Sequence, residues 1–298
     1  MTQPNENTST LQELQALAEQ GDAAAQCELG LRYANGIDTE KDLAKAHHYF
    51  TLSAEQGNAR GECALGVWYE KGYDGEPNPK QAYLWFRKSA EQGFAESQRR
   101  IASYYLEGKV VEQDDTQAAH WYRLAAEQGN KFAQTLLAGL YKNGEGVEQD
   151  DEQAAYWYRQ AAEQGDVYAQ YHLGTCYKEG LGVEKNGELC IYWYQQAADQ
   201  GDADAQFTLG TLYFDGDIVE EDDEQAVYWY RQAAEQGDEN AMDMLGYCYE
   251  NGYGVDEDLE QAIHWYRQAA ELGIEDAKEA LERIASGKKY REEDLLPW

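Results

Sequence analysis

Apolar residues in this chain recur in two alternating helical patterns, with a glycine after each one. In the stretch 154–162 they fall at i, i+3, i+4, i+7 and i+8, which is one stripe of an α-helix. The stripe consists of Ala154, Trp157, Tyr158, Ala161 and Ala162. A second helical pattern follows over 169–177, and Gly180 comes directly after it. The pattern predicts two amphipathic helices joined by a glycine turn.

The two-helix pattern repeats along the chain with a fixed period. The sequence Ala-Glu-Gln-Gly, or a near variant, returns every 36 residues and ends at Gly21, Gly57, Gly93, Gly129, Gly165, Gly201, Gly237 and Gly273. A strict period of this length is the mark of a repeat architecture. Gly165 is suited to the left-handed conformation that ends a helix, and Asp166 is placed to cap the next helix.

Each 36-residue unit has further fixed positions that indicate core packing. A tryptophan recurs in the second helix, and we expect it to fill the space between helices; the copies are Trp85, Trp121, Trp157, Trp193, Trp229 and Trp265. A mainly apolar position in the first helix belongs to the core, as Trp68, Tyr104, Leu140 and Leu212. We expect a loop valine, such as Val183, to hold the loop against the core. Acidic runs such as 148–152 precede the second helices, where the helix dipole favours carboxylates.

The ends of the array differ from its middle. The segment 11–20 resembles only a second helix, and 276–286 resembles only a first helix, so both are predicted to cap the stack. The fold class is therefore all-α, a right-handed α-solenoid (superhelix) of antiparallel helix pairs with a 36-residue period. We expect a polar tail over 1–10, a single solenoid domain over 11–286 with seven helix pairs, and a tail over 287–298.

The repeat resembles a known family. Its residues read Ala-x-x-x-Leu-Gly-x-x-Tyr-x-x-Gly, then Gly-Val, then Ala-x-x-Trp-Tyr-x-x-Ala-Ala-Glu-Gln-Gly. This is similar to the Sel-one-like repeat family, which is related to the 34-residue tetratricopeptide repeats. The resemblance implies a function as an adaptor or scaffold or, in bacteria, as an effector or toxin-neutralising partner. The first two copies depart from the pattern, with Thr39 and Gly75 at the loop valine position.

Charge narrows the choice of partner. The chain has 24 basic and 57 acidic residues, a formal net charge of −33. Proteins bind nucleic acids and anionic membranes largely through lysine and arginine. The excess of acidic residues therefore argues against direct binding to nucleic acid and against docking on an anionic membrane. It permits a basic protein partner. It is also explained by solubility alone.

Compartment and redox state are inferred from the same sequence. No apolar run approaches the roughly 18 residues of a membrane span, and the polar first ten residues do not resemble a secretion signal, so we expect a cytoplasmic protein. The five cysteines form no Cys-x-x-Cys pair and are expected to be reduced, small apolar fillers.

We find no catalytic, cofactor or metal site in the sequence. His48, His120 and His264 occupy one repeat position and are expected to lie too far apart to share a metal. A Ser-x-x-Lys match at Ser286–Lys289 lacks the companion motifs of penicillin-recognising enzymes. No phosphate loop or dinucleotide fingerprint is present.

The binding surface is expected on the first helices, which line the concave groove of such solenoids. A basic island and neighbouring aromatic residues stand out there, since arginine and aromatic side chains are common interface hot spots. The candidate residues are Arg60, Lys71, Arg99, Arg100, Phe132, Tyr168, Tyr171, His172, Phe207 and Tyr247. The alternative is that the aromatic residues pack against neighbouring helices.

Three functions are compatible with this sequence. The first is a non-catalytic adaptor, monomeric by default, that binds a protein or peptide in its groove. The second is a cytoplasmic immunity or antitoxin-type protein that neutralises a basic toxin or nuclease, which the charge of −33 motivates. The third is a hydrolase, which would need a compact pocket with perturbed titratable groups.

Overall fold

A computed structural model of the chain describes residues 10–73 and 75–287. In this part the chain forms sixteen α-helices and no strand. They group into two compact units, one ending at Ala161 and the other beginning at Ala162, and each unit is described by itself. Of the two predicted tails, only Thr10 and Gly287 lie inside the described residues.

The helix bounds follow the repeat. The first unit holds α1 (Leu11–Glu19), α2 (Ala23–Asn35), α3 (Leu43–Glu55), α4 (Ala59–Lys71), α5 (Pro79–Glu91), α6 (Ala95–Glu107), α7 (Asp115–Glu127), α8 (Lys131–Asn143) and α9 (Asp151–Ala162), which ends at the boundary. The second unit holds α10 (Val167–Glu179), α11 (Gly187–Ala198), α12 (Ala203–Asp215), α13 (Asp223–Glu235), α14 (Glu239–Asn251), α15 (Leu259–Leu272) and α16 (Glu275–Ala285).

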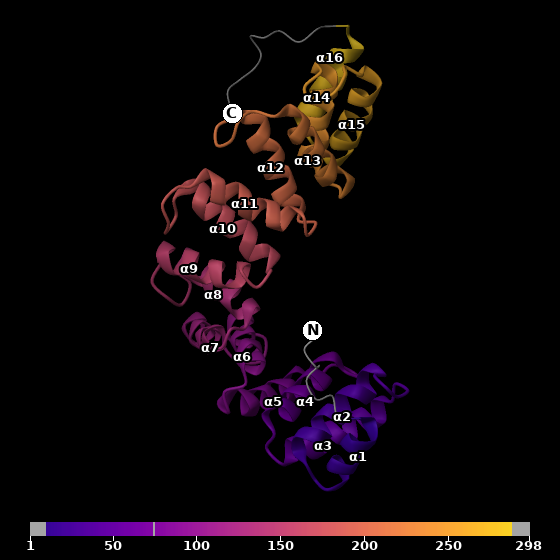
Figure 1. Cartoon of the computed structure of the whole chain (residues 1–298), viewed down its shortest axis with the longest axis vertical. Helices are drawn as coiled ribbons and strands as arrows, with labels where there is room; N and C mark the ends of the chain where they lie inside the picture. The colour runs from indigo at the N-terminus through magenta and orange to yellow at the C-terminus, as the bar shows by residue number, and fades with distance from the viewer. Residues whose placement is uncertain (1–9, 74, 288–298) are drawn as a thin grey trace, which may run out of the picture. The chain divides into compact units, whose positions relative to one another are not determined.

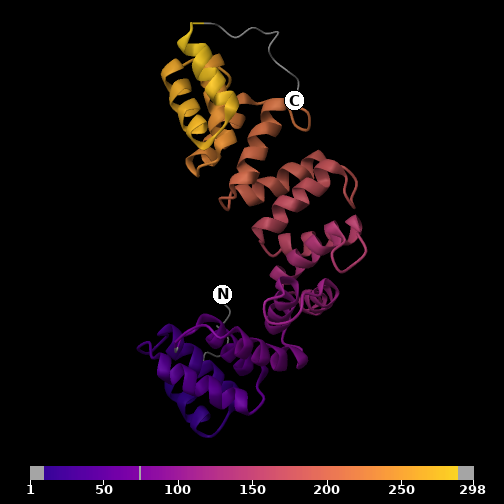
Figure 2. The ribbon, with the colours of Figure 1, turned by 180° about the vertical axis from the view of Figure 1, so that it is seen from behind.

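Helices that follow one another in the chain pack against one another within each unit (Figures 1 and 2). The first helix of a repeat pairs with its second helix, as α4 with α5 and α12 with α13, and the second helix packs on the next repeat. A lone α1 packs on α2, and a lone α16 packs on α15. The architecture is an all-α repeat solenoid.

Side-chain caps and glycines fix where the helices begin and end. The Asp166 side chain accepts a hydrogen bond from the backbone N–H of Ala169 at 3.0 Å, and Asp222 does the same for Gln225 at 3.0 Å. Such caps satisfy N–H groups that the first turn leaves unpaired. First helices end at a glycine in the left-handed region, such as Gly180 with φ 76°. The predicted capping and termination are confirmed.

A buried aromatic ring of each second helix lies on the first helix of its own repeat. Phe86 and Tyr230 are both 0% exposed, and their rings lie where a Cβ on Gly66 or Gly210 would come within 2.5 and 2.6 Å. Glycine in the Leu-Gly motif therefore allows the close approach of this ring. The remaining ring equivalents are Phe50, Tyr122, Tyr158, Tyr194 and Tyr266.

The tryptophans fill less of the interior than the sequence suggested. Trp157 and Trp229 are buried, but the other four copies are only half-buried. The residue one step along the helix is the one that points at the first helix, which explains the difference. The loop valines are half-buried, and Val111 and Val255 pack against the core as predicted. The core assignment at the Trp68 position is confirmed by an exposure of 3%.

Candidate partner-binding surface

The ten candidate residues divide evenly between the two units. We call Arg60, Lys71, Arg99, Arg100 and Phe132, on α4, α6 and α8, the first-unit surface. We call Tyr168, Tyr171, His172, Phe207 and Tyr247, on α10, α12 and α14, the second-unit surface. Each surface is built from neighbouring first helices of one unit.

The arginines of the first-unit surface are paired with glutamates. Arg99 donates two hydrogen bonds to Glu96, at 3.0 and 2.6 Å. Arg100 donates to Glu96 at 2.9 Å and to Glu70 at 2.5 Å. Burial by itself would raise the pKa of Glu96, but the hydrogen bonds and charges of the two arginines outweigh it and lower that pKa. The expected basic island is thus an electrically balanced network.

The other two cations of this surface lie nearer to solvent. Arg60 pairs with Glu28 at 3.1 Å and keeps 54% of its side chain exposed. Lys71 is exposed at the end of α4.

Phe132 projects from the first-unit surface. Its side chain is 53% exposed, although Leu137 on the same helix is completely buried. The Arg99 guanidinium lies 5.9 Å from the ring centroid, and the Lys131 ammonium lies 5.3 Å from it. Both distances are in the range of cation–π attraction. An exposed ring held between two cations is well suited to a contact with another molecule.

Tyr168 is the most exposed of the large apolar side chains on the second-unit surface. It is 59% exposed, and its ring meets that of His172 edge-on at 4.2 Å. Tyr171 is half-buried and lies 5.4 Å from the ring of the core residue Tyr194.

Two further aromatic residues of this surface also pack on neighbouring rings. Phe207 lies 5.8 Å from Tyr230, and Tyr247 stacks on Tyr253 at 5.6 Å. Packing on neighbours therefore applies to Tyr171, Phe207 and Tyr247, whereas Phe132 and Tyr168 reach into solvent.

Three aspartates on the second-unit helices escaped the sequence reasoning. Asp204, Asp243 and Asp276 stand at the same repeat positions as Arg99 or Phe132. One side-chain oxygen of Asp243, Oδ1, is buried and has no hydrogen-bond partner in the described part of the chain. Burial, and then the negative charge of Asp276, raises the pKa of Asp243 to about 6. Comparing repeat positions along the chain would have revealed these aspartates.

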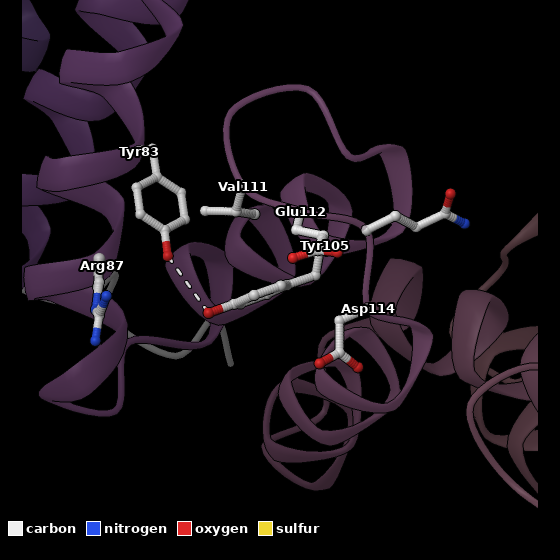
Figure 3. A pocket seen from close by; sticks show the side chains of 7 residues that line it. Tyr83, Arg87, Tyr105, Val111, Glu112 and Asp114 are labelled. Atoms are coloured by element: carbon white, nitrogen blue, oxygen red, sulfur yellow. Dashed lines mark hydrogen bonds between the residues drawn. The ribbon is translucent and has the colours of Figure 1, made fainter.

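A cavity of about 470 Å³ lies in the first unit, between α5, α6 and the loop that precedes α7 (Figure 3). It is lined by Tyr83, Arg87, Tyr105, Val111, Glu112, Gln113 and Asp114. The Tyr83 hydroxyl donates to that of Tyr105 at 3.5 Å, and Arg87 pairs with Glu91 at 2.9 Å.

One residue of the lining is unusual for its repeat position. In two later repeats the arginine that corresponds to Arg87 donates to a tyrosine of the next repeat, Arg123 to Tyr141 and Arg231 to Tyr249, both at 2.7 Å. Tyr83 stands where the later repeats have alanine, valine or isoleucine, and its hydroxyl bonds to the corresponding tyrosine, Tyr105, instead. Burial raises the pKa of Tyr83 to about 12, so its phenol stays protonated at neutral pH.

The buried cysteine thiols are kept in their neutral form. Burial raises the pKa of Cys27, Cys63 and Cys190 to about 11 and that of Cys248 to about 12, so these thiols stay protonated. All five cysteines are buried and none of them forms a disulfide. Within residues 10–73 and 75–287, no three His, Cys, Asp or Glu side chains are grouped so that they could hold a metal ion. Lys289, of the Ser-x-x-Lys match, lies outside the described residues.

The helices in the described part of the chain include none with the length and apolar character needed to cross a bilayer.

Comparison with known proteins identifies the class. The sequence model of the Sel1 repeat matches seven times, at 23–58, 59–94, 95–130, 131–166, 167–202, 203–238 and 240–274. The chain therefore belongs to the Sel1 repeat family. A search of curated proteins found no match.

Two solved structures extend this result. The chain is 37% identical to c5321, described as a protective antigen of uropathogenic Escherichia coli strains with an SLR fold, at a TM-score of 0.87 over 96% of this chain. It spans 62% of the length of that protein. It is 32% identical to a Sel1 repeat protein of Oxalobacter formigenes, at a TM-score of 0.69, covering 92% of this chain and 79% of that one.

Proposed function

We propose that this chain is a non-catalytic protein-interaction module that holds a partner protein or peptide in a groove lined by its first helices. The observation that carries the proposal is Phe132, an exposed ring flanked by Arg99 and Lys131 on a helix whose Leu137 and Leu140 pack inward. Exposed aromatic and arginine side chains dominate the binding energy of many interfaces. The Sel1 repeat fold supports the same class of function.

Partner capture with a matched pair of variants tests the proposal. The full chain is immobilised, proteins from a lysate of the source cells are captured, and the bound proteins are identified by mass spectrometry. Phe132→Ala removes the exposed ring of α8. Tyr156→Ala removes a ring that is equally exposed, at 50%, on the second helix α9. Charge reversal of Arg99 or Arg100 is avoided, because it would leave Glu96 without its partners.

The proposal predicts that a partner captured by the wild type is lost by Phe132→Ala and kept by Tyr156→Ala. If Phe132 is a hot spot, removal of its ring should weaken binding by about 30-fold or more. If Tyr156→Ala lost the partner and Phe132→Ala kept it, the interface would lie on the second helices, and the proposal would be contradicted.

The net charge of −33 favours a second candidate, a neutralising protein for a basic toxin or nuclease. Attraction between exposed charges is screened over about 10 Å at 0.1 M salt and about 3 Å at 1 M. The dissociation constant of the captured partner should then rise steeply between these two salt concentrations. An affinity that does not change with salt would eliminate this candidate.

We also place the protein in the cytoplasm as a monomer. Five buried cysteines that form no disulfide fit a reducing compartment. Immunoblotting of fractionated cells tests the compartment, and sedimentation tests the monomer.

A further inference from the structure

One arginine of the first unit shows how this repeat holds a guanidinium group. Arg99 occupies the fifth position of its first helix. It lies between a carboxylate at the second position of the same helix, Glu96, and a ring at the second position of the next first helix, Phe132. The repeat thus brings a carboxylate and an aromatic face to one cationic group.

The second unit presents the same two kinds of group at these positions. Two repeats further on, Tyr171 stands at the position of Arg99 and Asp204 at the position of Phe132. Phe207 stands on the same helix as Asp204, at the spacing that separates Glu96 from Arg99. Asp204 therefore has one aromatic residue on the preceding first helix, Tyr171, and another three residues along its own helix, Phe207.

The last pair of first helices in this unit, α14 and α16, carries two carboxylates at these positions instead. Asp243 and Asp276 occupy the positions of Arg99 and Phe132 four repeats further on. They lie close enough for the charge of Asp276 to act on Asp243, and one oxygen of Asp243 is buried without a hydrogen-bond partner among the described residues.

Among the residues that the structure describes, no cation of the chain balances these aspartates. In the first unit Glu28, Glu70 and Glu96 each have an arginine within 3.1 Å. In the part of the second unit that the structure describes, no Lys, Arg or His nitrogen lies within 4.0 Å of a carboxylate oxygen of Asp204, Asp243 or Asp276. The charge and ring pattern is therefore complementary to cationic groups that come from another molecule.

We propose that the second-unit surface binds an extended segment of a partner protein through arginine or lysine side chains, which lie between Asp204, Asp243 and Asp276 and the rings of Tyr171 and Phe207. This inference rests on the proposed function and specifies its partner as basic. Neighbouring packed helices lie roughly 8–10 Å apart, and an extended chain advances about 3.3 Å per residue. Cationic side chains at every third residue would then meet successive first helices.

Fluorescence anisotropy with the full chain tests the proposal. The probe is a labelled nonapeptide with arginine at every third position and alanine elsewhere, and a glutamine version is the probe control. The test variant is Asp204→Asn/Asp243→Asn/Asp276→Asn. The control variant, Glu188→Gln/Glu224→Gln/Glu260→Gln, changes three exposed carboxylates in the first turns of α11, α13 and α15. Both variants alter the net charge equally.

The expected result is binding of the arginine probe that weakens by about tenfold or more in the test variant and by less than about twofold in the control variant. Equal weakening would show that the probe responds only to total charge and would overturn the proposal. Failure of the wild type to bind the probe would also overturn it. A natural partner that is lost by Phe132→Ala but fully retained by the aspartate variant would leave the interaction module intact and reject this inference alone.

Discussion

Glu62 replaces a glutamine in a buried ladder of hydrogen bonds, so its substitution should stabilise the protein. In five other repeats a glutamine at this position donates its side-chain N–H to an alanine carbonyl eight residues earlier; these are Gln26, Gln98, Gln134, Gln170 and Gln206, at 3.0–3.4 Å. Glu62 is 5% exposed and accepts a hydrogen bond from Gln92 at 2.6 Å. As a carboxylate it cannot donate to the equivalent carbonyl, that of Ala54.

The Glu62→Gln substitution should add the missing donor and remove a buried charge. A hydrogen bond contributes about 0.5–1.5 kcal/mol, and a desolvated, incompletely paired polar group costs about 1–3 kcal/mol. Burial raises the pKa of Glu62, although the charge of Lys88 and the hydrogen bond from Gln92 partly offset this effect. We therefore expect Glu62→Gln to raise the free energy of unfolding by about 1–3 kcal/mol at pH 8.

The pH dependence gives an independent check. Because the pKa of Glu62 is higher in the folded state, the folded wild type binds the proton more tightly, and its stability falls as pH rises from the unfolded pKa through the folded pKa. Below that window the neutral acid can donate as the amide does. The advantage of Glu62→Gln should therefore shrink as pH falls from 8 to 4.

Urea titrations followed by circular dichroism at pH 8, 6 and 4 measure the effect, with hydrogen exchange to locate it on α4. Gln98→Glu is the matched control and should lose stability by a similar amount at pH 8. A Glu62→Gln variant that gains nothing at pH 8, or gains equally at every pH, would refute the reasoning.

Three further predictions follow from burial and close contacts. Gly66→Ala should lower the free energy of unfolding by about 1–3 kcal/mol in a urea titration, because its Cβ would lie 2.5 Å from the Phe86 ring. Gly139→Ala, whose Cβ would have nothing nearer than 3.9 Å, should raise it by up to about 1 kcal/mol. Equal effects of the two substitutions would contradict the packing argument. Gly146→Ala should lower the melting temperature severely, because φ is 68° and its Cβ would lie 2.0 Å from the Asp115 carbonyl oxygen; an unchanged melting temperature would refute this contact. Burial raises the pKa of Asp243 to about 6, so the Asp243 carboxyl should make wild-type stability fall as pH rises from about 4 to 6. Asp243→Asn should reduce that fall and stabilise the protein by about 1–2 kcal/mol at pH 8; a pH profile shared by both proteins would disprove this effect.

The helices could be predicted from the sequence because each repeat contains its own helix-start and helix-end signals. A capping Asp or Asn, an apolar stripe of period 3.6 and a glycine act within about a dozen residues, so Asp166 and Gly180 fix α10 locally. The period of 36 then fixes the order of packing. The candidate residues on the first helices followed from the same register.

The pairing of charged side chains could not be predicted, because partners come from different repeats. Arg100 and Glu70 lie 30 residues apart and meet only when α4 and α6 are stacked. The sequence therefore predicted a basic island, whereas in the structure Arg99 and Arg100 are balanced by glutamates. The hydrogen bond between Tyr83 and Tyr105 could not be predicted for the same reason, since the two tyrosines belong to successive repeats.

The sequence by itself determined the repeat and where its helices begin and end, because caps, glycines and periodicity are local. The tertiary structure decided which of those residues are already engaged. Phe132 and Tyr168 stay exposed, while Arg99 and Arg100 are held by Glu96. The physical reason is that burial and ion pairing depend on distances between helices, and those distances are set only when neighbouring repeats pack together.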